Sequence, residues 1–373
     1  MALSTGSKVF LVVLVVLLGG VGFGLYYVND QLSGEPGEGE PVPLTIEQGS
    51  TSAEIGQKLE QEGVIKNALA FRLVVRTQGT TFQAGDYELR TGMSVDEAIE
   101  ALGSGPQERE TFRFTVREGL AVPLILEELA AGIPQYSVED FRQVLDERIQ
   151  GGADGDGVLQ LPEWMPEPGS FGAEVGHPFE GLLFPETYEM FAEATPQDIL
   201  QRMIDQTARV MSEIPQDRVR QLGELVESDH SPQYTGLIIA SLIERETRVN
   251  DERTMVSSVI YNRIRENQPL QIDATVLYAL GKWKERVLTE DTEVDSPYNT
   301  YPNPGDPNPG LPPTPIANAG RSSIEAAFMP DDTDFLFYVL SPECDGTHQF
   351  AKTLDEHNAN VREFREAGRC LEE

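Results

Sequence analysis

The stretch "LIIASLIERET", residues 237–247, runs an apolar segment directly into two glutamates, Glu244 and Glu246. On a helix, residues at positions i, i+4 and i+7 share a face, so Ile239, Ile243 and Glu246 form one line. Glu246 then lies at the end of the buried stripe, whereas Glu244 points about 200° away from it. The pattern predicts a helix that cannot present both acids to one cleft.

A carboxyl at the end of an apolar stripe is partly removed from water, which raises its pKa and keeps it protonated near neutrality. A general acid must be protonated in order to give its proton to a glycosidic oxygen. The alternative is that Glu246 is an ordinary helix-end acid paired with Arg245, Arg248 or Arg253. On the residue pattern alone, this second interpretation is the more common one.

The segments that follow this helix concentrate amide, arginine and aromatic side chains, which are the usual groups that hold sugar rings. Each of these residues alone is more often structural, and Asn262 or Asp273 could cap a helix. Residues 296–320 add a stretch with eight prolines, and an ordered loop of that length is uncommon unless it is functional. The polar and aromatic residues concerned are Asn262, Arg263, Gln271, Asp273, Tyr298, Asn299 and Tyr301.

The composition excludes several classes of protein. Among the 373 residues, 62 acids against 28 basic residues give a formal net charge of −34, and such a surface repels the phosphates of nucleic acids. No HExxH motif occurs, and Cys344 and Cys370 have no metal-ligand spacing, so we expect no metal or other cofactor. Whether these cysteines form a disulfide stays open. The acidic segment 152–163 partly matches a calcium-binding loop, but an acidic turn fits better because Gly152 occupies the first ligand position.

Residues 9–28 are twenty residues without a charge, enough to span a hydrocarbon core of roughly 30 Å at about 1.5 Å per residue. Lys8 precedes them and acids follow, which predicts that residues 1–8 are cytoplasmic and that the body lies outside the membrane. A cleaved signal peptide is the alternative, but the apolar run is long and no A-x-A site follows it. We therefore expect a single transmembrane helix.

An internal repeat follows a Gly-, Pro- and Glu-rich linker at 29–42. Residues 44–65 match residues 114–133, and each copy predicts a short strand, a glycine turn at Gly49 or Gly119, and an amphipathic helix. Residues 82–102 predict a further strand and a helix capped by Ser94. Small modules of this kind act either as binding units or as spacers.

The remaining residues, 134–373, predict a mixed α and β domain, so the expected fold class is α+β. The stretch 179–190 reads as extended, either as a buried strand or as a wall that faces sugars. The helix at 251–266 would be capped by Asn250 or Asp251. The expected helices cover 138–149, 196–213, 235–248, 251–266, 274–280, 321–328 and 354–366, with a strand at 334–340.

Six segments in fixed order closely resemble the endolytic murein transglycosylase family of YceG-like proteins. They are "ASLIERET", "VSSVIYNRI", "PLQIDATVLYAL", "SPYNTY", "GLPPTPIANAG" and "HQFAKTLDEHN". The resemblance covers nearly the whole chain. It implies a LysM-like region at 43–133 and a YceG-like catalytic domain at 134–373, anchored in the cell (inner) membrane by residues 9–28.

The resemblance implies a lytic cut in nascent peptidoglycan, between N-acetylmuramic acid and N-acetylglucosamine, that leaves a 1,6-anhydro end and ends strand elongation. The catalytic acid of the family falls on Glu246, and Gln271, Asn299 and Tyr301 would contact the glycan. Glu244 would be a helper or an ion-pair partner. Cell-wall synthesis enzymes are conceivable partners. Two alternatives remain: a glycan-binding membrane scaffold without catalysis, and a hydrolytic muramidase that uses Asp273 or Glu252 as a second carboxylate.

Overall fold

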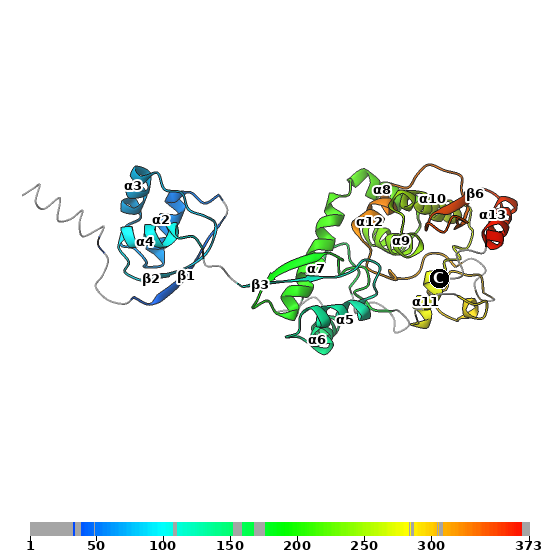
Figure 1. Ribbon diagram of the computed structural model, residues 1–373, viewed down its shortest axis with the longest axis horizontal. Coiled ribbons are helices and arrows are strands. Elements are labelled where there is room, and N and C mark those ends of the chain that lie inside the picture. Colours follow the sequence, from blue (N-terminus) through cyan, green and yellow to red (C-terminus); the bar gives the residue numbers. More distant parts are fainter. Residues whose placement is uncertain are drawn as a thin grey trace, which may run out of the picture. The chain divides into compact units, whose positions relative to one another are not determined.

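The computed structural model describes residues 39–47, 49–106, 110–151, 159–167, 176–282, 287–303 and 309–367, together with residues 33, 284 and 305. The expected transmembrane segment 9–28 and residues 152–158 of the acidic turn lie outside the described residues. In the part of the chain that is described, no helix is long and apolar enough to cross a membrane. The chain divides into two compact units, Met1–Glu110 and Thr111–Glu373 (Figure 1).

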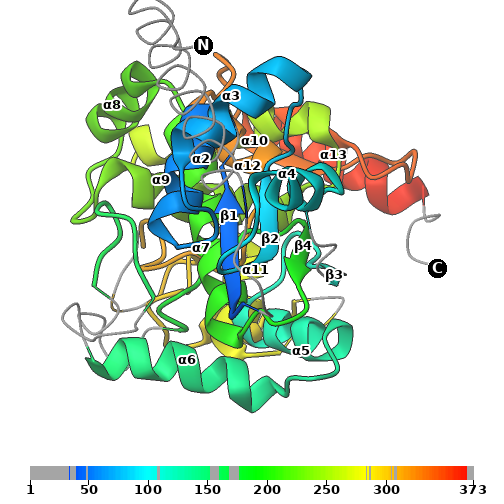
Figure 2. The same ribbon diagram turned by 90° about the vertical axis from the view of Figure 1, so that its left-hand side faces the viewer.

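The N-terminal unit is a two-stranded antiparallel sheet covered by three helices. Strand β1 (Pro41–Ile46) pairs with β2 (Gly85–Arg90), and the helices are α2 (Ser52–Gln61), α3 (Ala68–Gln78) and α4 (Val95–Gly103). Figure 2 shows the paired strands β1 and β2 side by side. Thr51 and Ser94 start α2 and α4 with capping boxes. The unit has its own core, which includes Leu59, Phe71 and Leu102.

The C-terminal unit is mainly helical, with two further antiparallel strand pairs, β3 with β4 and β5 with β6. Helices α5 and α6 lie next to each other (Figure 2). In chain order its elements are β3 (Thr111–Thr115), α5 (Val122–Gly132), α6 (Val138–Gly151), β4 (Thr187–Phe191), α7 (Pro196–Glu213), α8 (Gln216–Leu225), α9 (Pro232–Glu246), η2 (Asn250–Glu252), α10 (Arg253–Arg265), α11 (Asp273–Leu280), η3 (Asp291–Glu293), α12 (Arg321–Phe328), β5 (Phe337–Leu340), β6 (His348–Ala351) and α13 (Leu354–Ala367).

Helix α9 is the centre of this unit, with α8, α10 and α12 packed around it (Figure 1). Every residue from Tyr234 to Ile243 is buried, so the helix is apolar on all sides rather than along one stripe. Gly236 permits the close approach of α12, because a Cβ atom there would lie 2.1 Å from Phe328. The last turn of α9, which carries both glutamates, reaches the edge of the core, as do the first two residues of the helix.

Both copies of the repeat form the expected strand, turn and helix, at positions offset by about 70 residues. The second copy, however, lies in the C-terminal unit, since β3 pairs with β4 and α5 packs against β3 and α6. The contacts therefore divide the chain after Glu110, whereas the sequence places the boundary after residue 133. Pairing between segments more than 70 residues apart is not visible in local patterns.

Three local expectations differ from the structure. Neither Asn250 nor Asp251 caps α10, because both lie in η2 and the cap position is Glu252, without a side-chain hydrogen bond. Asp273 is the first residue of α11 rather than its cap, and its carboxylate accepts a hydrogen bond from Tyr301 instead. In the stretch 179–190, the first part forms turns, and the strand β4 begins only at Thr187.

Candidate active site

A cleft of about 870 Å³ opens at the C-terminal end of α9. Its walls come from the last turn of α9, from α10, from the segment that leads into α11, and from the β5–β6 hairpin. Charged and aromatic side chains from these elements line it, so it combines hydrogen-bonding groups with ring surfaces. The polar and aromatic lining includes Glu244, Arg245, Glu246, Arg248, Arg263, Gln271, Asp273, Tyr301, Phe337, Tyr338, His348 and His357.

Glu246 is the partly buried acid of this cleft. Its Oε2 accepts a hydrogen bond of 2.6 Å from the Tyr338 hydroxyl. Burial raises the pKa of Glu246 above its usual value, and the negative charge of Asp273 raises it further, while the Tyr338 hydrogen bond lowers it. Among the described residues Glu246 forms no ion pair, because Arg253 binds Glu244 and Arg245 donates to the Gly119 carbonyl oxygen. Among the described residues, the structure therefore does not contain the ion pair between Glu246 and a nearby arginine that the sequence offered as the alternative.

Tyr338 on β5 is held in place from the neighbouring strand β6. The His348 ring packs edge-on against the Tyr338 ring at 5.5 Å between centroids. Glu252 in turn fixes His348, with 2.7 Å from His348 Nδ1 to Glu252 Oε2 and 2.8 Å from the His348 backbone nitrogen to Oε1. Burial raises the pKa of the Tyr338 hydroxyl well above its usual value. This hydroxyl therefore remains a donor to Glu246 across the working pH range.

Asp273 and Tyr301 form a hydrogen-bonded pair in the lining of the cleft. The Tyr301 hydroxyl donates to Asp273 Oδ1 at 2.5 Å, and burial together with this carboxylate raises the pKa of Tyr301. Both side chains line the cleft. Asp273 is exposed and acts on Glu246 through its charge. The structure thus brings the expected substrate contact Tyr301 into the same cleft as the acid.

Gln271 lies on the cleft wall with its side chain exposed. Its φ angle of 53° is left-handed, which costs free energy for a residue other than glycine. The backbone is held there because the Gln271 nitrogen donates to the Thr300 carbonyl at 3.0 Å. Arg263 supports the same segment, since its Nη1 donates to the carbonyl oxygens of Pro269 and Leu270. Such a locally strained position beside a cleft fits a role in binding.

Asn299, in contrast, does not line the cleft. Its side chain is buried, with Nδ2 donating to the carbonyl oxygens of Thr292 and Val294 at 2.9 Å each. Its Oδ1 accepts from the Tyr301 backbone nitrogen at 3.0 Å. Every polar atom of the amide is thus used inside the protein. Asn299 positions the backbone of Tyr301. The sequence suggested instead that Asn299 contacts the substrate, which does not agree with this placement.

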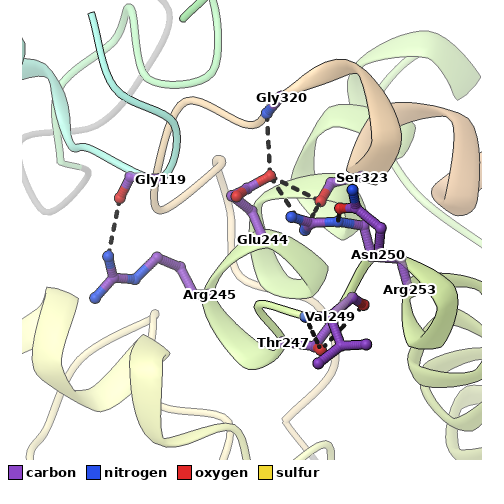
Figure 3. A network of polar contacts seen from close by, with 9 residues as sticks. All are labelled: Gly119, Glu244, Arg245, Thr247, Val249, Asn250, Arg253, Gly320 and Ser323. Atoms are coloured by element: carbon purple, nitrogen blue, oxygen red, sulfur yellow. Dashed lines mark hydrogen bonds and ion pairs between the residues drawn. The ribbon is translucent and has the colours of Figure 1, made fainter. Parts of the chain in front are cut away.

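Glu244 also borders the cleft, although the helix repeat predicts that the two acids do not share one cleft, and its carboxylate is held in a separate polar network (Figure 3). Its Oε2 accepts from the Gly320 backbone nitrogen at 3.1 Å and from Ser323 Oγ at 2.8 Å, and it forms an ion pair with Arg253 at 3.3 Å. The side chains of Glu244 and Arg253 are only 7% and 6% exposed. Glu244 therefore joins α9 to the start of α12 and is an ion-pair partner.

No group of three or more potential ligand side chains that could hold a metal ion occurs among the described residues. Cys344 is disulfide-bonded, and Cys370 lies outside the described residues. Among the described residues of the cleft, Glu246 is the carboxyl whose pKa is raised.

Tyr338 and His348 are the site residues that the sequence pattern missed. They are 92 and 102 residues from Glu246 in the chain. Tyr338 reaches Glu246 from β5, and His348 packs on Tyr338 from the paired strand β6. A weak signal existed, because a tyrosine in the apolar segment "DFLFYVL" needs a partner for its hydroxyl when it is buried. That signal does not say which residue the partner is.

Comparisons with known proteins agree with the resemblance. The model of a family described as the YceG-like family matches residues 44–363. A protein from Bacillus subtilis (strain 168) named endolytic murein transglycosylase is 39% identical over 326 residues, which is 85% of this chain and 83% of that protein. A protein of the same name from Streptococcus pneumoniae serotype 2 is 29% identical, over 95% of this chain and 64% of that protein. A crystal structure of a yceG-like protein from Listeria monocytogenes has a TM-score of 0.55 and 32% identity, covering 86% of this chain and 99% of that one.

Proposed function

The chain belongs to the YceG-like family, and we propose that it is an endolytic peptidoglycan lytic transglycosylase with Glu246 as its catalytic acid. The substrate is the glycosidic bond between N-acetylmuramic acid and N-acetylglucosamine in nascent strands. The observation that carries the proposal is a single partly buried glutamate of raised pKa in a cleft lined by aromatic and hydrogen-bonding side chains. The relatives named as endolytic murein transglycosylases support the same reaction.

In the first step, protonated Glu246 gives its proton to the bridging oxygen as the bond from that oxygen to the muramyl anomeric carbon breaks. The Tyr338 hydroxyl, 2.6 Å from Glu246 Oε2, stabilises the carboxylate that forms. In the second step, the C6 hydroxyl of the same muramyl ring attacks the anomeric carbon and its proton returns to Glu246. The product is a 1,6-anhydro ring, and the acid is regenerated without water.

A hydrolase would need a second carboxylate to activate water. Glu252 does not line the cleft and is occupied by His348, which leaves Asp273 as the candidate. Asp273 accepts from Tyr301, and in our proposal its negative charge serves to keep Glu246 protonated. We further propose that Gln271 and Tyr301 contact the glycan.

The experiment is digestion of purified nascent glycan strands, with mass spectrometry of the muropeptides released. The wild-type protein should give 1,6-anhydro ends, and Glu246→Gln should give none. Glu224→Gln, an exposed acid on α8 away from the cleft, is the matched control and should cut normally. Hydrated reducing ends would establish the muramidase alternative. A wild-type protein that binds strands and never cuts them would establish the scaffold alternative.

We also propose that residues 9–28 anchor the protein in the cell membrane and that the β1–α2–α3–β2 arrangement is a LysM-like module. The uncharged twenty-residue run and the βααβ order of the N-terminal unit support these assignments. Deleting residues 1–28 should move the protein from the membrane fraction to the soluble fraction. A chain without these residues that still sediments with membranes after a salt and carbonate wash would contradict the anchor.

A further inference from the structure

Helix α3 of the N-terminal unit (Ala68–Gln78) has an apolar face that nothing covers within the described part of that unit. Phe71 and Val75 turn into the core and are buried. Leu69 and Leu73, by contrast, are 73% and 65% exposed. They are spaced by four residues, so both lie on the side of the helix opposite the core. Two large exposed leucines on one helix turn favour a binding surface over ordinary solvent exposure.

Two arginines complete the same face. Arg72 and Arg76 follow Leu69 by three and seven residues, which puts all four side chains on one stripe. Both arginines are exposed, and neither forms an ion pair with any residue that the structure describes. The absence of partners is notable in a chain of net charge −34. We call Leu69, Arg72, Leu73 and Arg76 the α3 stripe.

The stretch of sequence that carries the stripe contains no acids, although α2 and α4, which pack against α3, carry several. The segment from Gly63 to Gly85 contains Lys66, Arg72 and Arg76 and no aspartate or glutamate. Acids occur on both sides of it, at Glu62 and Asp86. Three of the five basic residues of the segment 39–106, Lys66, Arg72 and Arg76, therefore lie on or just before the helix that also exposes leucines.

We propose that the α3 stripe docks on the surface of an anionic lipid bilayer. Leucines on such a helix enter the boundary between headgroups and acyl chains, while arginine side chains reach the lipid phosphates. The inference rests on the proposed anchor at residues 9–28. The dozen residues from 29 to 40 can extend over at most roughly 40 Å, so the bilayer is always within reach of this unit. Charge complementarity then favours the lipid surface as the occupant.

Docking of the α3 stripe would determine where the reaction takes place. A module that lies flat on the bilayer surface would hold the chain close to the membrane, where nascent strands emerge, in addition to the tether. A second weak contact on a short tether acts at a high effective concentration, so modest affinity of the stripe is sufficient. The contact depends on the tether but not on the chemistry of the cleft.

The test uses the N-terminal unit alone, residues 39–106, which has its own hydrophobic core and contains no cysteine. An N-terminal histidine tag attaches it to vesicles through a nickel-chelating lipid, which replaces the natural anchor. A fluorophore is placed on α3 by Thr77→Cys or, as a positional control, on α4 by Glu100→Cys; both residues are exposed. Vesicles contain phosphatidylcholine alone or with 30% phosphatidylglycerol, and a nitroxide lipid reports contact by quenching.

We expect the α3 label to be quenched at least three-fold more than the α4 label, only with phosphatidylglycerol, and less at high salt. The double change Arg72→Gln and Arg76→Gln should lower the docking equilibrium constant roughly 30-fold. Lys58→Gln with Arg90→Gln changes the net charge equally away from the stripe and should retain docking. The double change Leu69→Ser and Leu73→Ser, which removes the apolar part of the stripe, should abolish docking.

Three results would overturn the proposal. Equal quenching of the two labels would mean that α3 does not face the lipid. Docking that survives loss of both arginines, or is as strong on phosphatidylcholine alone, would remove the role of charge. Concentration-dependent self-association in the analytical ultracentrifuge, abolished by the leucine changes, would assign the stripe to a second copy of the chain. Circular dichroism melts confirm that each variant is folded before it is scored.

Discussion

Replacing Glu244 with glutamine should damage stability and leave catalysis intact. The change removes the counter-ion of Arg253 in a place where both side chains are almost fully buried. Breaking a buried pair by removing one partner costs about 3–5 kcal/mol. Arg253 keeps hydrogen bonds to Asn250 and Ser323. Burial raises the pKa of Glu118, and the Glu244 charge raises it further. Glu118 can ionise more easily once that charge is gone, so we expect the lower end, about 3 kcal/mol.

A loss of about 3 kcal/mol lowers the melting temperature of a unit of this size by roughly 6 °C or more. Circular dichroism melts of Glu244→Gln at pH 7 measure this. The rate of anhydro-muropeptide release at 25 °C, where the variant is still folded, should stay within about two-fold of the wild-type rate.

Glu246→Gln should behave in the opposite way. The pKa of Glu246 is raised in the folded protein, so the stability linked to this group is present at low pH and is lost as the pH rises through the folded-state pKa. Glutamine does not ionise, so the variant does not lose stability as the pH rises. Its melting temperature at pH 8 should therefore equal or exceed that of the wild type, while its activity disappears. A Glu244→Gln protein that melts normally but cannot cut glycan would refute the division of roles between the two acids.

Three further variants test the electrostatics of the site and of the core. Tyr338→Phe removes the hydrogen bond that favours ionised Glu246, so the pKa of Glu246 should rise and the alkaline limb of the rate–pH profile should move to higher pH. Asp273→Asn removes a charge that raises the same pKa, and the limb should move downward; equal directions for the two variants would contradict the assignment. Burial raises the pKa of Glu180 from 4.5 to about 8, so its stabilising contribution is fully present below pH 4.5 and is lost as the pH rises through about 8. Glu180→Gln should therefore melt at a higher temperature than the wild type at pH 9, and the two proteins should melt alike near pH 4.

Much of the fold follows from local patterns. The limits of α7 and α12 agree with the expected helices 196–213 and 321–328, because each has a clear apolar face and a defined start. Ser94 caps α4 as expected. Patterns of this kind act within one or two helix turns and so are visible in the sequence. The pairing of β3 with β4, which moves the domain boundary, depends on residues far apart and is not visible there.

The candidate site shows the same distinction between features set by local sequence and features set by distant pairing. The spacing on α9 was enough to separate the two glutamates, since their directions depend only on the helical repeat. Asn299 was misjudged because a polar side chain next to a cleft residue can point either way, and its amide is used up by Thr292 and Val294. Tyr338 was missed because its partner depends on the β5–β6 pairing. Sequence therefore identifies the acid better than it identifies what surrounds the acid.

The internal repeat explains what holds the arginine next to Glu246 in the chain. In the N-terminal copy, the glycine turn is open, and a Cβ atom on Gly49 would meet nothing within 4 Å. In the second copy, the equivalent Gly119 packs against α9, and its carbonyl oxygen accepts from Arg245 Nη1 at 2.9 Å (Figure 3). With φ at 75°, this position suits glycine, and its nitrogen donates to the Asn318 carbonyl of the proline-rich segment. The second copy thus takes up the arginine adjacent to Glu246, while Glu244 takes up Arg253. Burial is the largest influence on the pKa of Glu246 and raises it, although the charges of His348 and Arg245 still act to lower it.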